Sequence, residues 1–563
     1  MSERDLILAK IVAGSLESAA REMSAVVTRT ARSPLFNEAH DFTTGIFDLD
    51  AGGQARLIAQ APGCTLHLYA ICPAVQAALA AFGSDLHPGD VLLASDPYDG
   101  GTHIPDHVLI VPVFVGGRPR YFPVVRAHLA DVGGPVPGGY NPRALDIWQD
   151  GVVMPPIKLY ERGRRRDDLY HLVLANNRLP HWLEGDLAAM RGACAVAERR
   201  IHALLRRHGE AVTAAAIEHN LDYTERRVRA EIARWQDGCY SAETFADHDY
   251  HGHLDIRVRC TATVQGSDLS IDFAGTSAQV DGFINSPLAN TLSFVFVAIT
   301  SCCDEDIPIN EGYMRPLRVT APSGSLVNPQ HPRPVGNCTC ISGAEIAESV
   351  LLALSQCAPQ RVGVNCHKLP LCYTSGDYAD GSGWVNLNFF GYTGGAGAAY
   401  GTDGWGLYPP LMTGVILPSI EVSERQYPLR ILRHEYLADR TGAGRWRGAP
   451  GVETLIEYQV ATRNQVLMAG VRHPSRGFCG GGDGAPNQLA LIAPGQDPQR
   501  FEQAAYDHAL PAGARLHFIR GGGGGWGDPR QRPRAEVLDD VRNGYLSAAA
   551  AWRDYGQRVE EGQ

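Results

Sequence analysis

The sequence predicts a mixed α/β (α+β) chain: an N-terminal α/β half with a candidate metal site at strand–loop junctions, and a C-terminal half built on antiparallel sheet. Three observations predict this. Apolar residues recur at helical spacing in 4–32 and 187–235. The apolar runs VLIVPVF and YFPVV flank the turn VGGRPR, a pattern typical of a β-hairpin. From about residue 240, apolar and polar residues alternate, and the turn QGSD then precedes LSIDF.

The length of 563 residues exceeds what one ordinary core organises, so we expect more than one domain. The change in pattern near residue 240 places the main boundary. We predict an N-terminal metal-binding domain over 1–238, a β-rich α+β domain over 239–530, and a helical tail over 531–563.

The sequence predicts a first helix over 4–32, a short strand over 45–49, a helix over 66–82 that is broken near Pro73, and a long helical tract over 187–235. It further predicts a hairpin that starts at Ile256, helices near 288–302 and 344–357, and two short C-terminal helices, one after Pro533 and one between Ser547 as N-cap and Gly556.

Two H-x-x-D units mark the hairpin ends, His103 with Asp106 and His128 with Asp131. An antiparallel return brings His128 back beside His103, and two imidazoles with a carboxylate form a ligand set for a divalent metal. The alternative is a buried His–Asp hydrogen bond with a purely structural role. Asp41, just ahead of the first strand, is open to two interpretations: a turn or cap residue, or a further carboxylate ligand.

Composition excludes several classes of protein. A net charge of −11 argues against a nucleic-acid binder, since phosphate affinity comes from clustered Lys and Arg. No apolar run reaches the length of a membrane span. The N-terminus does not resemble an export signal and the 13 cysteines are scattered, so we expect a cytoplasmic protein with free thiols. The glycine-rich runs 388–406 and 520–529 match no phosphate-binding loop, and the five consecutive glycines of the second run are expected to allow close backbone approach or tight turns.

Longer motifs carry a resemblance to a known family. They read HDFTTGIFD (40–48), PGDVLLASDPYDGGTHIPD (88–106), RAHLADVGG (126–134), GFINSPLANT (282–291), DIPINEG (306–312), RWRGAPG (445–451) and GGGGGWGDP (521–529). In this order and over essentially the whole chain, the sequence resembles the hydantoinase B/5-oxoprolinase B-domain family, which also includes a subunit type of acetone and acetophenone carboxylases.

The resemblance implies a site. The family's motifs place the ligands of a catalytic divalent metal (Zn, Mn or Fe) on His103, Asp106 and His128, with Asp41 as a fourth ligand. Such a metal lowers the pKa of a bound water, and Asp131 or Asp41 is then the general base. The chain departs from the family's pattern with D-F-T for D-F-S, with His40, and with Ser95 where Asn is usual, which points to a divergent substrate pocket.

The resemblance also implies a partner and a reaction. Such proteins work with an A-type (hydantoinase A-like) ATPase subunit, so ATP is expected on the partner rather than on this chain, in a hetero-oligomer such as a dimer of heterodimers. The first hypothesis is an ATP-dependent cyclic amidase acting on a hydantoin, 5-oxoproline or another lactam. The second is a subunit of an ATP-dependent ketone carboxylase. Two further readings are a non-haem iron oxygenase, which uses the same ligand types, and a structural subunit with a degenerate site.

Overall fold

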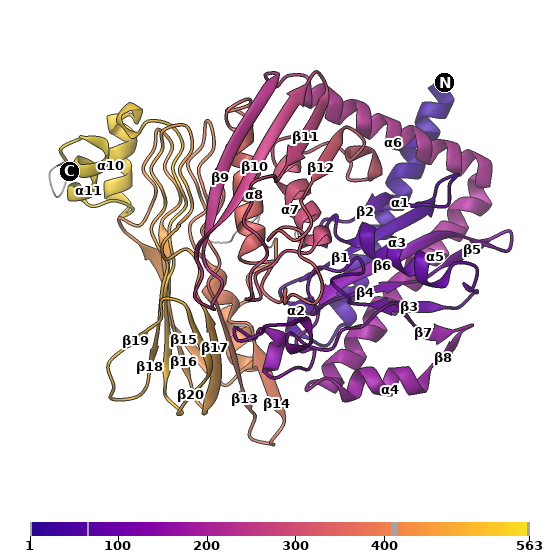
Figure 1. The fold of residues 1–563 in the computed structure, drawn as a ribbon, viewed down its shortest axis with the longest axis horizontal. Coiled ribbons are helices and arrows are strands. Elements are labelled where there is room, and N and C mark those ends of the chain that lie inside the picture. Colours follow the sequence, from indigo (N-terminus) through magenta and orange to yellow (C-terminus); the bar gives the residue numbers. More distant parts are fainter. Residues whose placement is uncertain (1–2, 65–66, 407–413, 560–563) are drawn as a thin grey trace.

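A computed structural model describes residues 3–64, 67–406 and 414–559 of the chain (Figure 1). Helices gather around a first sheet in the N-terminal half, and three further sheets follow along the rest of the described chain (Figure 1). The predicted mixed α and β fold is confirmed. One continuous core reaches from α1 (Glu3–Thr30) to β21 (Arg515–Ile519) and thus crosses the boundary expected at residue 238, which stays a prediction.

The first sheet is antiparallel throughout and carries the predicted hairpin. Its order is β2 (Ala55–Gln60), β1 (Phe42–Leu49), β6 (Arg118–His128), β4 (Asp106–Ile110), β3 (Val91–Ala94), β7 (Ile157–Glu161) and β8 (Arg164–Arg165), with β5 (Val113–Val115) paired to β6. The strand predicted over 45–49 is β1, which begins three residues earlier. Both faces of this sheet are covered, so its strands are buried along most of their length.

Helices cover both faces of the first sheet. On one side, α1 packs with α5 (Pro180–His208) and α6 (Glu210–Ile232), α2 (Pro34–Asn37) contacts α1 and β6, and α4 (Asp167–Ala175) contacts α5. The tract predicted over 187–235 is therefore two helices, because Gly209 with φ +80° interrupts it. The other face packs against α3 (Ile71–Phe82) in a separate apolar cluster.

The helix predicted over 66–82 differs at its start. It begins at Ile71, and Leu66 lies outside the described residues. Pro73 stands in its first turn, where the missing backbone N–H breaks no helical hydrogen bond, so the proline permits the helix start instead of breaking the helix.

The middle of the chain forms a second sheet with the order β12 (Leu317–Thr320), β11 (Asp268–Asp272), β10 (Leu254–Gln265) and β9 (Gly238–His248). The β10–β11 pair is the predicted hairpin, closed at Gln265 and Asp268. The two predicted helices are present as α7 (Leu288–Thr300) and α8 (Ser342–Leu354), and α8 packs on β9 and β10.

Two antiparallel sheets make up the C-terminal half. One has the order β14 (Gly383–Asn386), β13 (Leu371–Asp377), β17 (Thr462–Leu467) and β20 (Ala504–Leu510); the other runs β15 (Leu429–Leu437), β16 (Gly451–Tyr458), β21, β18 (Gln488–Ile492) and β19 (Gln499–Arg500). Helices α9 (Ile420–Gln426), α10 (Arg534–Arg542) and α11 (Ala548–Tyr555) complete the chain, together with the short 3-10 turns η2 (Pro137–Gly139), η3 (Ile147–Gln149), η4 (Glu311–Tyr313), η5 (Phe389–Tyr392) and η6 (Pro529–Gln531). The Ser547 and Gly556 caps of α11 are confirmed.

Glycine-rich segments run side by side between the last sheets and the C-terminal helices (Figure 1). The run 521–525 lies at their centre and exchanges backbone hydrogen bonds with neighbours on several sides: Gly395 N to Gly521 O (3.0 Å), Gly442 N to Gly523 O (2.8 Å) and Gly525 N to Gly482 O (2.9 Å). The expected close backbone approach is confirmed, since a Cβ added at Gly523 would lie 1.9 Å from the carbonyl oxygen of Ala396.

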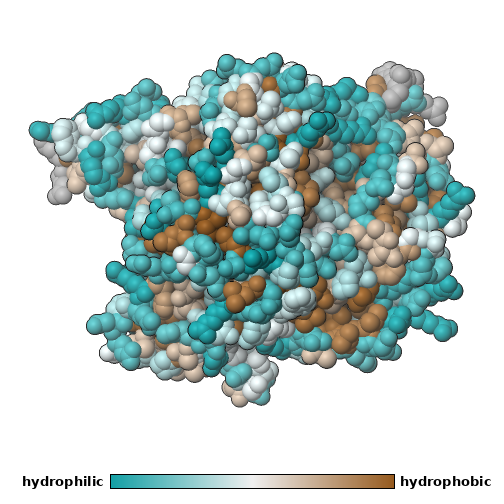
Figure 2. Space-filling model, viewed as in Figure 1, coloured by the Kyte–Doolittle hydropathy of each residue, from teal (hydrophilic) through white to brown (hydrophobic). Residues whose placement is uncertain are grey.

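Among the described residues, no helix combines the length and the apolar character that crossing a bilayer requires. The face shown in Figure 2 is mainly hydrophilic but carries several apolar patches. Large exposed apolar side chains include Trp148, Leu172 and Trp405, which are 60%, 58% and 83% exposed.

Candidate metal centre

The hairpin register places the candidate ligands next to one another. In the antiparallel pair of β4 and β6, Asp106 stands directly opposite His128, while His103 lies in the turn that leads into β4. The expected return of His128 to the side of His103 is therefore confirmed. All three side chains are buried, because the sheet is covered on both faces.

Two imidazoles converge on one carboxylate. His103 Nε2 lies 2.9 Å and His128 Nδ1 lies 3.3 Å from Asp106 Oδ1, and the two ring centroids are 5.0 Å apart. One donor atom from each of the three residues lies within 4.8 Å of the others. Two ring nitrogens and a carboxylate oxygen in this arrangement fit a divalent cation such as zinc, manganese or iron.

The second carboxylate oxygen of Asp106 contacts the buried guanidinium group of Arg126. Arg126 on β6 is fully buried and its Nη2 lies 3.2 Å from Asp106 Oδ2, which also accepts a hydrogen bond from the Thr102 hydroxyl. Burial raises the pKa of Asp106, but the imidazoles of His103 and His67 outweigh burial and hold the pKa well below its usual range. The carboxylate is thus ionised and presents Oδ1 to the two histidines.

Asp41 is brought to the site by its backbone, while its carboxylate turns aside. Its carbonyl oxygen accepts the backbone N–H of His128 at 3.1 Å, which fixes it beside the end of β6. Its Oδ1 lies 3.2 Å from Nε2 of His67. Asp41 groups with Cys64 and His67 as potential metal ligands, and not with His103, Asp106 and His128 (the hairpin triad). Burial raises the pKa of Asp41, yet the hydrogen bond from His67 and the nearby imidazole of His128 leave it below its usual range.

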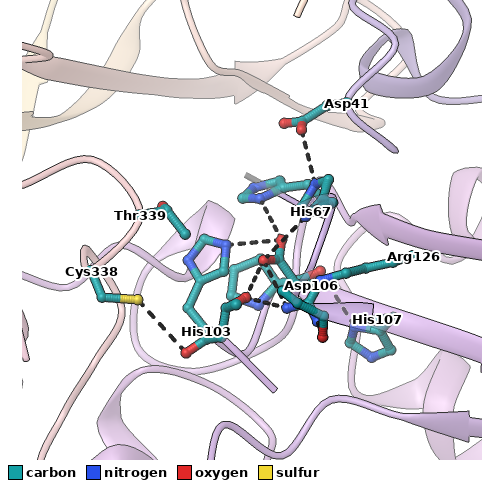
Figure 3. Close-up of polar contacts among 12 residues, drawn as sticks. Asp41, His67, His103, Asp106, His107, Arg126, Cys338 and Thr339 are labelled. Carbon is teal, nitrogen blue, oxygen red and sulfur yellow. Dashed lines mark hydrogen bonds and ion pairs between the residues drawn. The ribbon is translucent and has the colours of Figure 1, made fainter. Parts of the chain in front are cut away.

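Sequence reasoning missed two residues of this centre, His67 and Arg126 (Figure 3). His67 is 1% exposed and lies between Asp41 and Asp106. It stands in a short loop without periodic spacing to other polar residues, so spacing alone does not single it out. Arg126 stands two residues before His128 in the quoted motif, and its place on a buried strand is the signal that was available, because a buried arginine requires a partner.

Asp131 has a different environment from the hairpin triad. Its carboxylate accepts hydrogen bonds from the backbone N–H groups of Gly133 (3.2 Å), Gly138 (3.0 Å) and Arg178 (2.8 Å), and Arg178 Nη1 lies 3.0 Å from Oδ1. These contacts hold the segment after β6 in place. Its predicted role as general base stays a prediction, and these contacts favour a role in loop anchoring.

The Gly- and Pro-rich segment after Asp131 covers the site. It delivers Tyr140, whose ring stacks on Tyr373 of β13 with centroids 4.2 Å apart and lies 5.8 Å and 6.0 Å from the rings of His103 and His128. Both tyrosines are 2% exposed. The C-terminal half therefore supplies part of the wall.

A loop from the middle of the chain closes the opposite side. The carbonyl oxygen of Gly336 lies 2.9 Å from His103 Nδ1, and Cys338 Sγ lies 3.6 Å from the carbonyl oxygen of Thr102 (Figure 3). The carboxylate of Asp150 accepts the backbone N–H of Val335 at 2.7 Å and so holds this loop. Nδ1 of His103 is thereby fixed against a carbonyl, which leaves Nε2 free to face the site.

Comparisons with known proteins agree with this architecture. Residues 5–529 match the family described as hydantoinase B/oxoprolinase. The chain is 34% identical over 572 residues to the caprolactamase subunit beta of Pseudomonas jessenii, with 100% of this chain and 97% of that protein covered.

Solved structures are similar over the same extent. The crystal structure of ATP-dependent caprolactamase from Pseudomonas jessenii superposes with a TM-score of 0.93 at 33% identity, covering 99% of this chain and 97% of that one. A nucleotide-free acetone carboxylase superposes with a TM-score of 0.91 at 19% identity, covering 100% of this chain and 80% of that one, which shows a shared fold.

Proposed function

Because this chain belongs to the hydantoinase B/oxoprolinase family, we propose that it is the B-type, metal-binding subunit of an ATP-dependent enzyme that hydrolyses a cyclic amide. The observation that carries the choice of substrate class is the full-length likeness to caprolactamase subunit beta. The convergence of His103, Asp106 and His128 carries the choice of a metal centre.

The proposed partner is an A-type ATPase subunit. An unstrained amide is a poor electrophile, and transfer of a phosphoryl group from ATP to its oxygen makes its carbon reactive. The related caprolactamase is described as ATP-dependent and this chain's relative as its beta subunit, which supports the division into two subunits. The apolar patches on the surface provide area for such a partner (Figure 2).

The residues of the centre then have distinct roles. His103, Asp106 and His128 would hold the divalent cation, with Asp41 as a further carboxylate. A cation bound there supplies Lewis acidity, lowering the pKa of water and polarising the activated substrate. Arg126 binds the second carboxylate oxygen of Asp106, and Tyr140 and Tyr373 exclude bulk water.

Asp41 is the better placed of the two predicted proton acceptors. It is ionised and 8% exposed, and within the described part of the chain its carboxylate has one side-chain donor, His67, whereas the oxygens of Asp131 are taken up by loop contacts. In the hydrolysis, the water oxygen bonds to the activated carbon and loses a proton to Asp41. The ring nitrogen takes up both protons of that water, one of them by way of Asp41, as the C–N bond breaks, which leaves an acyl phosphate. A second water then hydrolyses the acyl phosphate to a carboxylate and free phosphate.

A ketone carboxylase is the second candidate. The acetone carboxylase structure shares the fold, and the same ligands suit either reaction. At 19% identity that likeness does not extend to the reaction, so the cyclic amidase is preferred.

The test is co-expression with the A-type subunit, followed by assays of ATP hydrolysis and ring opening on lactams, hydantoins and 5-oxoproline, and of ATP hydrolysis on ketones with bicarbonate. We expect ring opening that falls at least about 100-fold in His103→Ala, because loss of a metal ligand exceeds the effect of losing an outer contact. His171→Ala, on the exposed face of α4, is the matched control and should keep full activity. Full turnover in His103→Ala, or turnover of ketones alone, would contradict the proposal.

A further inference from the structure

Both ring nitrogens of His67 face carboxylates of the metal centre. Nε2 lies 3.2 Å from Asp41 Oδ1, and Nδ1 lies 3.6 Å from Asp106 Oδ2. The ring is 1% exposed, and Nδ1 has no hydrogen-bond partner among the residues that the structure describes. A buried imidazole thus lies between two candidate ligand carboxylates (Figure 3).

A second cation held by Asp41, Cys64 and His67 is the first role to weigh, since their donor atoms lie within 4.8 Å of one another. The charges of the centre argue against it. As metal ligands, the carboxylates of Asp41 and Asp106 bring two formal negative charges, and the buried guanidinium of Arg126, 3.2 Å from Asp106, cancels one of them. One divalent cation is then roughly balanced, whereas a second leaves a large uncompensated positive charge in a buried site, even with Cys64 as a thiolate.

The two contacts of His67 are not equivalent. A neutral imidazole donates from one nitrogen only. The 3.2 Å contact to Asp41 is within hydrogen-bond range, and the 3.6 Å contact to Asp106 is not. Asp106 also accepts hydrogen bonds from Arg126 and Thr102, so it has no need of a further donor. His67 is the side-chain donor to Asp41.

We propose that His67 is the positioning residue of the metal centre: through Nε2–H it orients the Asp41 carboxylate for the single cation held by His103, Asp106 and His128. This inference rests on the proposed function, because it presupposes that cation. Outer partners of metal-ligating carboxylates fix their orientation, and their loss lowers metal affinity by about 10–100-fold.

Three variants of the full-length chain separate the two contacts. In His67→Gln the amide nitrogen takes the place of Nε2, in His67→Asn it takes the place of Nδ1, and His67→Ala has neither. The probe is Zn²⁺ titrated calorimetrically into the metal-stripped chain. We expect affinity to fall about 10–100-fold in His67→Ala and His67→Asn, and to stay within about 3-fold of wild type in His67→Gln.

A double-mutant cycle distinguishes positioning from a general structural effect. If His67 acts through Asp41, then His67→Ala has no further effect on Zn²⁺ affinity in an Asp41→Ala background. Additive losses, or a His67→Gln variant as weak as His67→Ala, overturn the proposal, and so does a His67→Ala variant that binds as tightly as wild type.

His103→Ala is the reference for the proposed function itself. If it binds Zn²⁺ as tightly as wild type, the hairpin triad is not the metal site and both proposals fail. If it loses Zn²⁺ while His67→Ala does not, only the inference about His67 fails.

Discussion

At the scale of single residues, the centre depends on side chains that hold ligands as much as on the ligands. Arg126 and Thr102 occupy one oxygen of Asp106, and Gly336 fixes the tautomer of His103. These contacts leave Oδ1 of Asp106 and Nε2 of His103 facing the candidate metal site. A ligand set arranged before the cation arrives loses less conformational freedom on binding, which favours tight binding.

Asp186 holds the backbone in a comparable way between α1 and α2, a few residues before Asp41. Its Oδ1 accepts the backbone N–H groups of Arg32 (2.8 Å) and Ser33 (3.0 Å), where the chain turns from α1 into α2. Burial raises the pKa of Asp186 to about 6. Because the folded chain holds this proton more tightly than the unfolded chain, the stabilisation is present below about pH 4 and is lost as pH rises to about 6.

We therefore predict that Asp186→Asn, which keeps the acceptor oxygen without the charge, unfolds at the same temperature as wild type at pH 4. Above pH 6 it should unfold about 2 °C higher, since a shift of about two pKa units corresponds to roughly 3 kcal/mol spread over a large unfolding entropy. Thermal denaturation at pH 4, 5, 6 and 7 measures this difference. A constant difference across that range would show that Asp186 is ionised throughout.

At the scale of elements, the glycine-rich segments around 521–525 (the glycine layers) connect the last sheets to the C-terminal helices, and backbone hydrogen bonds join them. Backbone segments approach so closely that a Cβ at Gly522 would lie 1.8 Å from the carbonyl oxygen of Arg440. The stability of this region comes from backbone hydrogen bonds between segments, so it tolerates no side chain at the central run.

We predict that Gly523→Ala disrupts this region, seen as loss of soluble protein or as a fall of several degrees in the unfolding temperature. Gly14→Ala is the matched control, because nothing lies within 4 Å of its added Cβ and it sits in the interior of α1. That exchange should stabilise the chain by up to about 1 kcal/mol, the helix-propensity difference between the two residues. Equal effects of the two exchanges would show that the layers are loosely packed.

The sequence predicted elements well where side chains alternate in a simple pattern. The hairpin of β4 and β6 was predicted because two apolar runs flank a glycine turn, and its register brought His103, Asp106 and His128 together as expected. For the glycine layers, the sequence predicted only that backbone segments approach one another closely. Their partner segments are far apart along the chain, and glycine has no side chain whose spacing reveals a pairing.

At the scale of the whole molecule, the site lies where distant segments meet. The proposed ligands His103, Asp106 and His128 come from one hairpin, but Asp41 directly precedes β1, Gly336 lies in the middle of the chain, and Tyr373 comes from a C-terminal sheet. Sequence reasoning found the hairpin ligands because they are close in sequence. It missed His67 because only the folded chain places that ring between Asp41 and Asp106.

This arrangement leads to a prediction about stability. A cation that binds the folded chain alone stabilises it by about 2.7 kcal/mol at a 100-fold excess over its dissociation constant. For a chain of 563 residues that corresponds to a rise of about 2 °C in the unfolding temperature. Calorimetric scans of the metal-stripped chain with and without Zn²⁺ measure the rise, which His103→Ala should abolish and His171→Ala should keep. Because the walls of the centre come from both halves, the rise should appear in the unfolding of both; a shift confined to the N-terminal half would mean that the C-terminal wall contributes nothing to holding the cation.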